Sequence, residues 1–393
     1  MEKKSSEEEQ PVVVPVKHLP KKKRKKIRWA RLMGLVGFLV LAGGILFLKF
    51  DLGAAAIFTD NVLRPLIGDS RVIYLEGLFF NTSDQMQRLA SPLEKPKAPQ
   101  FIDPGKTNLE SSGLDLSPIK LANNFSPLAG EGTWRDYPLQ LFPGKEAMAY
   151  TFVRPDPARS YAMVTMVQLD MSVMRLGSVA GTQQPGGPVK KPGPGVVPKD
   201  VIDSGNLIAA FDGGFQYKDG AYGMIVGNTT YLPLKYDLGT LVGYTDGTLK
   251  IVNYTGQSLG SNIAFVRQNC PLLIDNGTIT VTDSKDRKLW GRLATGTVGI
   301  YTWRSGIGLS KNGNLIFAVG NNLTPDTLAI ALQAAGAVNA IQLDINPIWV
   351  RFNIFEPSGS GQYTSTTLTK DLADGAKQYL HGYQKDFFYV YKK

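Results

Sequence analysis

The clearest pattern of apolar and polar positions lies between Leu315 and Phe352. An apolar run from Leu315 to Val319 is bounded by turn residues, as in a buried strand. Thr324-Pro325-Asp326 then supplies an N-cap hydroxyl, a proline at the first helical position and an acidic residue in the first turn. A second apolar run, Val338 to Leu343, ends at Asp344. The pattern predicts a right-handed strand–helix–strand crossover onto a parallel pair, with Asp344 at the strand end where ligands gather in such sheets.

Short apolar runs separated by turn residues continue through the sequence from Gly130 onward. Strands are predicted at residues 148–153, 161–171 and 207–211, and Asn-Gly or Asp-Gly pairs beginning at 246, 276 and 312 predict hairpins. Residues 181–198 are rich in glycine and proline and predict an irregular loop. The predicted fold class is α+β, a mixed β-sheet domain with a βαβ crossover.

The amino-terminal part of the chain has a different pattern. Lys21 to Arg31 holds eight basic residues in eleven positions, and Leu32 to Leu48 follows as 17 uncharged, mostly apolar residues. With its apolar neighbours this run approaches the roughly 20 residues that a membrane-spanning helix needs. Basic residues before it and few after it predict a cytoplasmic amino terminus. A cleaved signal peptide is the alternative, because Ala54-Ala55-Ala56 resembles a cleavage site, but the apolar run is longer than usual for one.

These patterns divide the chain into four predicted parts. Residues 1–31 form a cytoplasmic basic tail, 32–50 a transmembrane signal anchor, 51–129 a membrane-proximal region and 130–393 the main domain. Within the third part, Ser70 to Met86 predicts an amphipathic helix with Val72, Leu75 and Phe79 on one stripe. The predicted location is the cell membrane, as a single-pass protein whose carboxyl-terminal domain lies outside the cytoplasm.

The net charge of +10 is concentrated in the tail. Residues 1–50 hold 12 Lys and Arg against 4 Asp and Glu, whereas the other 343 residues hold 31 against 29. The main domain therefore has no general charge that favours nucleic acid, and no nucleic-acid partner is predicted. Only if Lys21 to Arg31 lay away from a membrane would it indicate such a partner.

Cysteine and histidine are too scarce for several kinds of site. Cys270 is the only cysteine, so an intramolecular disulfide is excluded, and its apolar surroundings predict a buried small side chain. The two histidines, His18 and His381, make a zinc site or a Ser–His–Asp triad improbable. No residue spacing specifies a metal site, and the sequence identifies no cofactor.

Three stretches carry residues suited to chemistry. Asp212-Gly213-Gly214 follows a predicted strand, and the glycines allow positive φ and close approach of backbone amides to a ligand, although a tight turn with a solvated aspartate is the alternative. Arg304 precedes a run of small residues and suits bidentate recognition of phosphate or carboxylate, a surface salt bridge being its alternative. Asp344 is a candidate catalytic carboxylate with Asn346 as its partner, or else a turn cap before a proline.

Together these stretches resemble the phosphodiester glycosidase family, which includes the lysosomal uncovering enzyme. In that family an Asn-Gly-Gly-Phe turn follows a strand, Arg-Thr-Ala-Ile-Gly precedes a hairpin, and Gly-Ala-x-x-Ala-x-x-Leu-Asp follows a helix. The corresponding stretches occur here in the same order, as Asp212 to Phe215, Arg304 to Gly308 and Gly336 to Asp344. The resemblance spans roughly Gly130 to Phe355.

The sequence departs from the family pattern at three places. Asp212 stands where asparagine is usual, and residues 286–301 look like an insertion before the arginine. Ile345 to Ile348 reads Ile-Asn-Pro-Ile, where the branch of the uncovering enzyme has Gly-Gly-Gly-Ser. The motif Leu-Asp-Ile-Asn is similar to that of a membrane-anchored bacterial branch of the family.

The resemblance implies a hydrolase that cleaves a sugar–phosphate diester of the cell envelope. Asp344 and Asp212 would form the carboxylate pair, and their separation would indicate retention or inversion. Arg304 would hold the phosphate, while substrate binding would fall to three further residues, Gly213, Gly214 and Asn346. The expected partners are the lipid bilayer and a carbohydrate or sugar-phosphate ligand. The alternative is a non-catalytic envelope-binding module, whose contact surface would be formed by Ile345 to Ile348 and the aromatic residues between 379 and 391.

Overall fold

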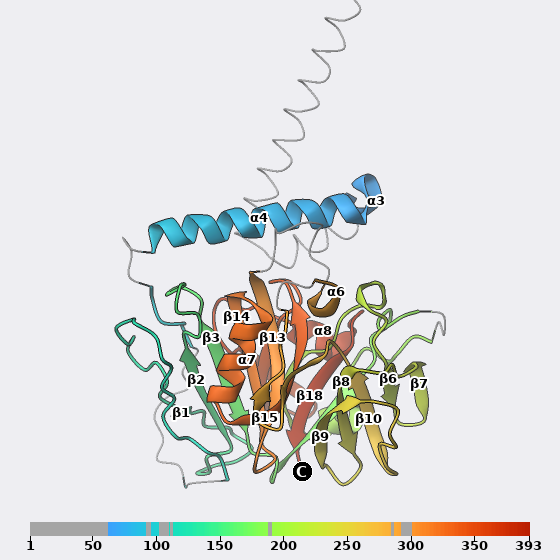
Figure 1. Cartoon of the computed structure of the whole chain (residues 1–393). Helices are drawn as coiled ribbons and strands as arrows, with labels where there is room; N and C mark the ends of the chain where they lie inside the picture. The colour runs from blue at the N-terminus through green and yellow to red at the C-terminus, as the bar shows by residue number, and fades with distance from the viewer. Residues whose placement is uncertain are drawn as a thin grey trace, which may run out of the picture. The chain divides into compact units, whose positions relative to one another are not determined.

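The computed structural model describes residues 62–91, 96–101, 110, 113–187, 191–283, 287–291 and 301–393 (Figure 1). The chain divides into two compact units, Met1–Ala55 and Ala56–Lys393, and every described residue belongs to the second. The predicted basic tail and the predicted transmembrane anchor lie outside the described residues. Among the helices that are described, none is long and apolar enough to cross a membrane.

The described residues fold mainly into three β-sheets. The eight-stranded sheet has the order β1 (Arg135–Asp136), β2 (Met148–Val153), β3 (Val164–Leu169), β14 (Leu315–Leu323), β13 (Thr302–Ser310), β15 (Ala337–Ile345), β11 (Leu272–Asp275) and β12 (Thr278–Ile279). One five-stranded sheet has the order β17 (Gln362–Thr367), β16 (Phe352–Gly359), β5 (Leu207–Asp212), β18 (Phe387–Lys392) and β4 (Met174–Val179). The other has the order β7 (Thr229–Leu232), β6 (Met224–Val226), β10 (Ile263–Gln268), β8 (Leu238–Tyr244) and β9 (Leu249–Tyr254).

Helices are fewer and mostly short. They are α3 (Arg64–Ile67), α4 (Asp69–Ala90), α5 (Lys199–Asp203), the 3₁₀ helix η2 (Tyr217–Asp219), α6 (Arg287–Trp290), α7 (Pro325–Ala334) and α8 (Ala376–His381). The described part of the chain is thus a sheet-dominated α+β domain, which confirms that part of the predicted fold class.

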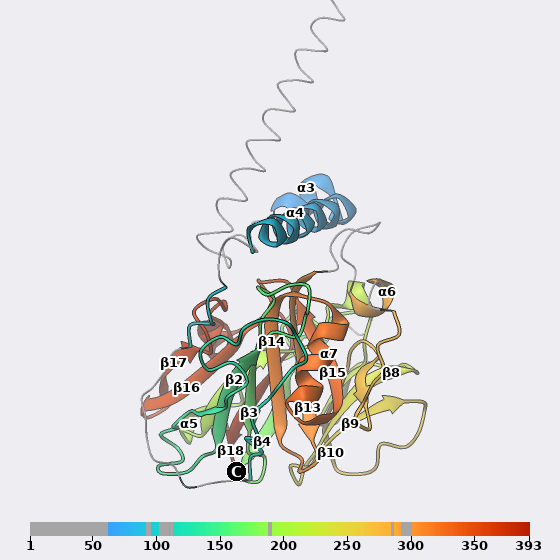
Figure 2. The same cartoon turned by 60° about the vertical axis from the view of Figure 1, so that its left-hand side comes forward.

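The predicted crossover is present, but its two strands are not neighbours. Thr324 caps α7 through the hydroxyl of its side chain, which accepts from the Thr327 amide, and α7 packs against the sheet between β14 and β15 (Figures 1 and 2). Both strands pair antiparallel with β13, so they run in the same direction with β13 between them. The two strands of the crossover are thus parallel as predicted, but they are not hydrogen-bonded to each other. The hairpin through Asn312 and Gly313 places β13 beside β14, so β15, which follows α7, pairs with the other edge of β13.

Most other predicted elements match the structure closely. β2 has the predicted bounds, β3 is shorter than the predicted strand at 161–171, and β5 extends by one residue to include Asp212. β14 continues past its predicted end to Leu323, and its pairing with β13 shifts register between Gly320 and Leu323. The predicted hairpins at 246, 276 and 312 join β8 to β9, β11 to β12 and β13 to β14.

The helix predicted at Ser70 to Met86 is confirmed as α4, which is longer than expected at both ends. Its Val72 is buried. Asp84 on the same helix accepts hydrogen bonds from the guanidinium group of Arg159 at 2.8 and 3.0 Å and from the Tyr161 hydroxyl at 2.7 Å. These bonds join α4 to the segment that leads into β3.

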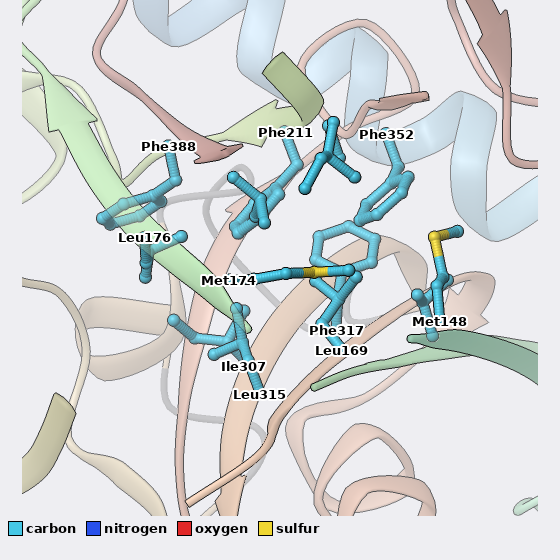
Figure 3. Packing of buried hydrophobic residues seen from close by; sticks show 14 of the residues in the cluster. Met148, Leu169, Met174, Leu176, Phe211, Ile307, Leu315, Phe317, Phe352 and Phe388 are labelled. Carbon is cyan, nitrogen blue, oxygen red and sulfur yellow. The ribbon is translucent and has the colours of Figure 1, made fainter. Parts of the chain in front are cut away.

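Packed phenylalanine rings join the eight-stranded sheet to the five-stranded sheet that contains β5 (Figure 3). The Phe211 ring on β5 stacks on Phe352 with centroids 5.7 Å apart, and lies 5.0 Å from Phe317 on β14. Phe388 on β18 contacts the same ring. Because Asp212 directly follows Phe211, this core holds the end of β5 against the eight-stranded sheet.

The aromatic residues near the carboxyl terminus belong to the interior. Five of the six are buried, namely Tyr379, Tyr383, Phe387, Phe388 and Tyr389, and the sixth, Tyr391, is half-buried. The prediction that they would form an exposed contact surface in a binding module is wrong, because β18 is an inner strand between β5 and β4, and the rings of Tyr379 and Tyr383 pack on Phe387 of that strand. Cys270 is fully buried as predicted, and burial raises the pKa of its thiol to about 12.

Candidate functional site

Asp212 and Asp344 lie together at the ends of β5 and β15. The Asp344 amide donates to Asp212 Oδ2 at 3.3 Å, and the Ser305 hydroxyl donates to the same oxygen at 2.5 Å. The other carboxyl oxygen of Asp212 accepts from the Arg351 amide at 2.9 Å. The structure thus brings two predicted carboxyl groups into one hydrogen-bonded network.

Burial raises the pKa of both carboxyl groups. The pKa of Asp212 is raised to about 7, first by burial and then by the negative charge of Asp344. The pKa of Asp344 is raised to about 6 by burial, although the positive charge of Lys385 opposes the rise. Near neutral pH, Asp212 therefore holds a proton more readily than Asp344 does.

Lys385 is a site residue that the sequence analysis missed. Its ammonium group donates to Asp344 Oδ2 and lies 4.6 Å from the ring centroid of Trp349. Burial alone would lower the pKa of Lys385, but the charge and hydrogen bond of Asp344, together with Tyr383 and Asp386, outweigh it, so the net direction is upward. A buried lysine next to a buried carboxylate keeps both groups charged. The sequence feature that could have indicated it is the charged pair Lys385-Asp386, which directly precedes the apolar run of β18.

A second buried ion pair supports the turn after β5. Arg267 binds Asp386 through two bonds, Nε to Oδ2 at 2.8 Å and Nη2 to Oδ1 at 3.1 Å. The Gly214 amide donates to the same carboxylate at 2.9 Å. The guanidinium group also donates to three main-chain oxygens, those of Phe215, Tyr222 and Gln268. With these bonds the pair satisfies its buried charges inside the protein.

Gly213 and Gly214 are required for close packing rather than for positive φ. Neither residue adopts the left-handed conformation that the sequence pattern allowed. A side chain at Gly213 would collide with Asp386, and a Cβ at Gly214 would lie 2.6 Å from the guanidinium group of Arg267. The glycines therefore let the turn approach the buried ion pair, and their role in substrate binding stays a prediction.

Arg304 is buried, which is incompatible with the surface salt bridge considered above. Its Nε donates to the Leu323 carbonyl at 3.0 Å, and its Nη1 donates to the Trp290 carbonyl at 3.1 Å and to Gln342 Oε1 at 2.8 Å. Burial lowers the pKa of Arg304 to about 10. These described bonds join β13 to β14, α6 and β15, while its predicted contact with phosphate stays a prediction.

Asn346 begins a tight turn that covers the Asp344–Lys385 ion pair. Its φ is 78°, and its carbonyl accepts from the amides of Trp349 and Val350, both at 3.2 Å. Its side-chain oxygen is buried without a described partner, so Asn346 does not form the turn cap that was the alternative. The turn places Trp349 beside Lys385.

Metal ligands are not gathered at this site in the part of the chain that the structure describes. Within those residues no three His, Cys, Asp or Glu side chains converge. The donor groups around Asp212 and Asp344 are instead a lysine, a hydroxyl and main-chain amides. The described site suits proton transfer between two carboxyl groups of different pKa.

Comparisons with known proteins agree with the motifs. The sequence model of the phosphodiester glycosidase family matches residues 205–344, which include Asp212, Arg304 and Asp344. No curated protein matches the chain.

Three solved structures are similar at low identity. The zebrafish N-acetylglucosamine-1-phosphodiester alpha-N-acetylglucosaminidase catalytic domain, described as auto-inhibited by its pro-peptide, has 12% identity over 72% of this chain and 99% of that chain, with a TM-score of 0.41. A hypothetical protein from Synechocystis has 13% identity over 63% of each chain, with a TM-score of 0.33. A putative exported protein from Burkholderia pseudomallei has 9% identity over 58% of this chain and 74% of that chain, with a TM-score of 0.26.

The family match covers the strand end that carries Asp212, the strand that carries Arg304 and the crossover that ends at Asp344. This confirms the resemblance drawn from the motifs: residues 205–344 match the phosphodiester glycosidase family.

Proposed function

We propose that this protein is a hydrolase that cleaves the glycosidic bond of a sugar–phosphate diester. The observation that carries the proposal is the pair of buried carboxyl groups, Asp212 and Asp344, joined in one hydrogen-bonded network. Hydrolysis of a glycosidic bond requires one carboxyl group that donates a proton and one carboxylate that acts as nucleophile or base. Two neighbouring carboxyl groups with different environments can supply these two roles.

The surroundings of each carboxyl group favour one assignment of roles. Lys385 stabilises the ionised form of Asp344, so this carboxylate acts as nucleophile or as base toward water. Asp212 has only neutral donors around it, and burial beside Asp344 favours its protonated form. In the proposed reaction Asp212 protonates the phosphate leaving group as the glycosidic bond breaks.

Ser305 can form a hydrogen bond with Asp212 whether that carboxyl group is protonated or ionised. Its hydroxyl lies 2.5 Å from Asp212 Oδ2 and 3.2 Å from the Asp344 carbonyl oxygen. When Asp212 is protonated, Asp212 can donate to Ser305 while Ser305 donates to the Asp344 carbonyl. When Asp212 is ionised, the hydroxyl turns and donates to it. Ser305 can therefore stabilise either form of the acid without moving its oxygen.

The setting of the reaction is also part of the proposal. The basic tail and the apolar segment at 32–50 support a single-pass anchor in the lipid bilayer, with the main domain outside the cytoplasm. Sugar–phosphate diesters of the cell envelope would then be the substrates within reach. A reporter fused to the carboxyl terminus tests the orientation, because activity only in the cytoplasm would contradict it.

The rate of diester hydrolysis is expected to have a maximum between about pH 6 and pH 7. Below the pKa of Asp344, near 6, the nucleophile or base becomes protonated; above the pKa of Asp212, near 7, the acid loses its proton. The measurement is kcat/KM for a sugar-1-phosphate diester from pH 4 to 9. In Asp212→Asn the residual rate should lose the alkaline decline, and an unchanged alkaline limb would contradict the assignment of Asp212 as the acid.

A further inference from the structure

Arg351 is a buried cation whose side chain lacks hydrogen-bond partners at two nitrogens. The residue is 4% exposed, and neither Nε nor Nη1 has a partner among the described residues. Its guanidinium carbon lies 5.3 Å from the ring centroid of Tyr383, an interaction that stabilises the charge only partly. Leaving a buried cation without hydrogen-bonded compensation is costly, because the charge has lost its water.

Tyr379 places a second unpartnered donor next to Arg351. Tyr379 is fully buried, and its hydroxyl has no partner within the described part of the chain. A Cβ added at Gly375 would lie 2.9 Å from Arg351 Cδ and 2.9 Å from the edge of the Tyr379 ring, so the two side chains meet over this glycine. Buried polar groups normally find partners, and two such donors side by side indicate a missing acceptor.

The main chain of Arg351 is hydrogen-bonded to Asp212, one of the two proposed catalytic residues. The Arg351 amide donates to Asp212 Oδ1 at 2.9 Å, and the Asp212 amide donates to the Arg351 carbonyl at 3.4 Å. The Tyr383 ring, over which the Arg351 guanidinium lies, packs edge-on against the Tyr379 ring with centroids 5.7 Å apart. A ligand group bound by Arg351 and Tyr379 would therefore lie beside the proposed catalytic pair.

The other described cationic side chains near this site already have hydrogen-bond or ion-pair partners within the protein. Lys385 is paired with Asp344, and Arg267 is paired with Asp386. The described bonds of Arg304 go to main-chain carbonyls and to Gln342. An anionic substrate approaching Asp344 would be repelled unless a positive charge met it, and the unpartnered nitrogens of Arg351 fit that requirement.

We propose that Arg351 and Tyr379 bind the anionic phosphoryl group of the substrate. The proposal deepens the hydrolase function above and rests on it for the identity of the anion. Arg351 would donate from its unpartnered nitrogens and Tyr379 from its hydroxyl, and the bound group would present its bridging oxygen to Asp212. Arg351 follows directly on the turn that begins at Asn346.

Binding of inorganic phosphate to the full-length protein tests the site without requiring turnover. Calorimetric titration is expected to show phosphate binding that weakens at least about tenfold in Arg351→Met and about threefold to tenfold in Tyr379→Phe. Arg175→Met is the matched control, because Arg175 also has a buried unpartnered nitrogen but lies at the far end of β4 and β18 from Asp212. The control should bind phosphate as the unaltered protein does.

The possible results distinguish a failure of the proposed anion site from a failure of the proposed hydrolase function. Phosphate binding that disappears in Arg351→Met, with no diester hydrolysis in any protein, supports the anion site and overturns the hydrolase proposal. Diester hydrolysis with phosphate affinity unchanged in both variants overturns the anion site and leaves the hydrolase proposal standing. Absence of phosphate binding by the unaltered protein up to about 10 mM also overturns the site. If Arg351→Met does not fold, Tyr379→Phe and Arg351→Lys give the same comparison.

Discussion

Asp344→Asn is expected to lower the rate of sugar–phosphate diester hydrolysis by about a thousandfold or more. Asparagine fills nearly the same space but cannot act as nucleophile or base. The substitution also leaves the buried ammonium group of Lys385 without its counter-charge. Steady-state kinetics on the purified protein measure the loss, and kcat should fall much more than KM rises, because the missing group acts on the transition state.

Two further variants separate the chemical effect of Asp344→Asn from an effect on folding. Asp246→Asn makes the same change in the exposed hairpin between β8 and β9 and should retain full activity. Adding Lys385→Met to Asp344→Asn removes the unpaired charge and should recover stability without recovering activity. Activity within about threefold of the unaltered protein in Asp344→Asn would show that the carboxylate has no catalytic role.

Arg267→Met is expected to lower the free energy of unfolding by about 3–5 kcal/mol. The variant leaves the Asp386 carboxylate buried with one remaining described donor, the Gly214 amide, and leaves three main-chain oxygens without their guanidinium partner. Unfolding by urea, followed by tryptophan fluorescence, measures the change. A loss of activity should accompany it, because Asp386 adjoins Lys385 and the glycine turn that follows Asp212.

An exposed ion pair supplies the comparison for Arg267→Met. Lys199 and Asp203 lie 2.5 Å apart on α5 with side chains 85% and 55% exposed. Lys199→Met should therefore change the free energy of unfolding by no more than about 1 kcal/mol. In the double variant Arg267→Met with Asp386→Asn, part of the lost stability should return, because no unpaired charge remains. Equal effects of Arg267→Met and Lys199→Met would show that the buried pair does not support the turn.

Local patterns in the sequence predicted the elements around the site well. The cap at Thr324 specifies where α7 begins, and the Asn-Gly and Asp-Gly pairs specify the hairpins, because these signals depend on neighbouring residues only. The position of β13 between β14 and β15 depends on which strand edges meet after folding. No local pattern in the sequence contains that information, so the order of strands was not predicted.

The carboxyl pair was predictable, whereas its supporting residues were not. Asp212 and Asp344 each follow an apolar run directly, and both belong to motifs of the phosphodiester glycosidase family. Lys385 lies 41 positions after Asp344, and Arg267 lies 119 positions before Asp386. Partners so distant appear in the sequence as isolated charges, and only the packing of β18 between β5 and β4 brings them to the site.

The two arginines near the site show how burial changes an interpretation. The small-residue run after Arg304 indicated an arginine open to a phosphate group, and the structure buries it among main-chain carbonyls. Arg351 had no such signal, since valine and phenylalanine flank it in the sequence. Only the folded structure shows that two of its side-chain nitrogens are buried without a described hydrogen-bond partner.

The most direct test of the proposed function is hydrolysis of a sugar-1-phosphate diester by the full-length protein in water enriched in oxygen-18. Attack at the anomeric carbon, with Asp212 and Asp344 acting as assigned, breaks the bond between that carbon and the phosphate oxygen. Mass spectrometry should then find the heavy oxygen in the released sugar and none in the phosphomonoester. Heavy oxygen in the phosphomonoester, or no product at any pH from 4 to 9, would contradict a glycosidase mechanism for this carboxyl pair.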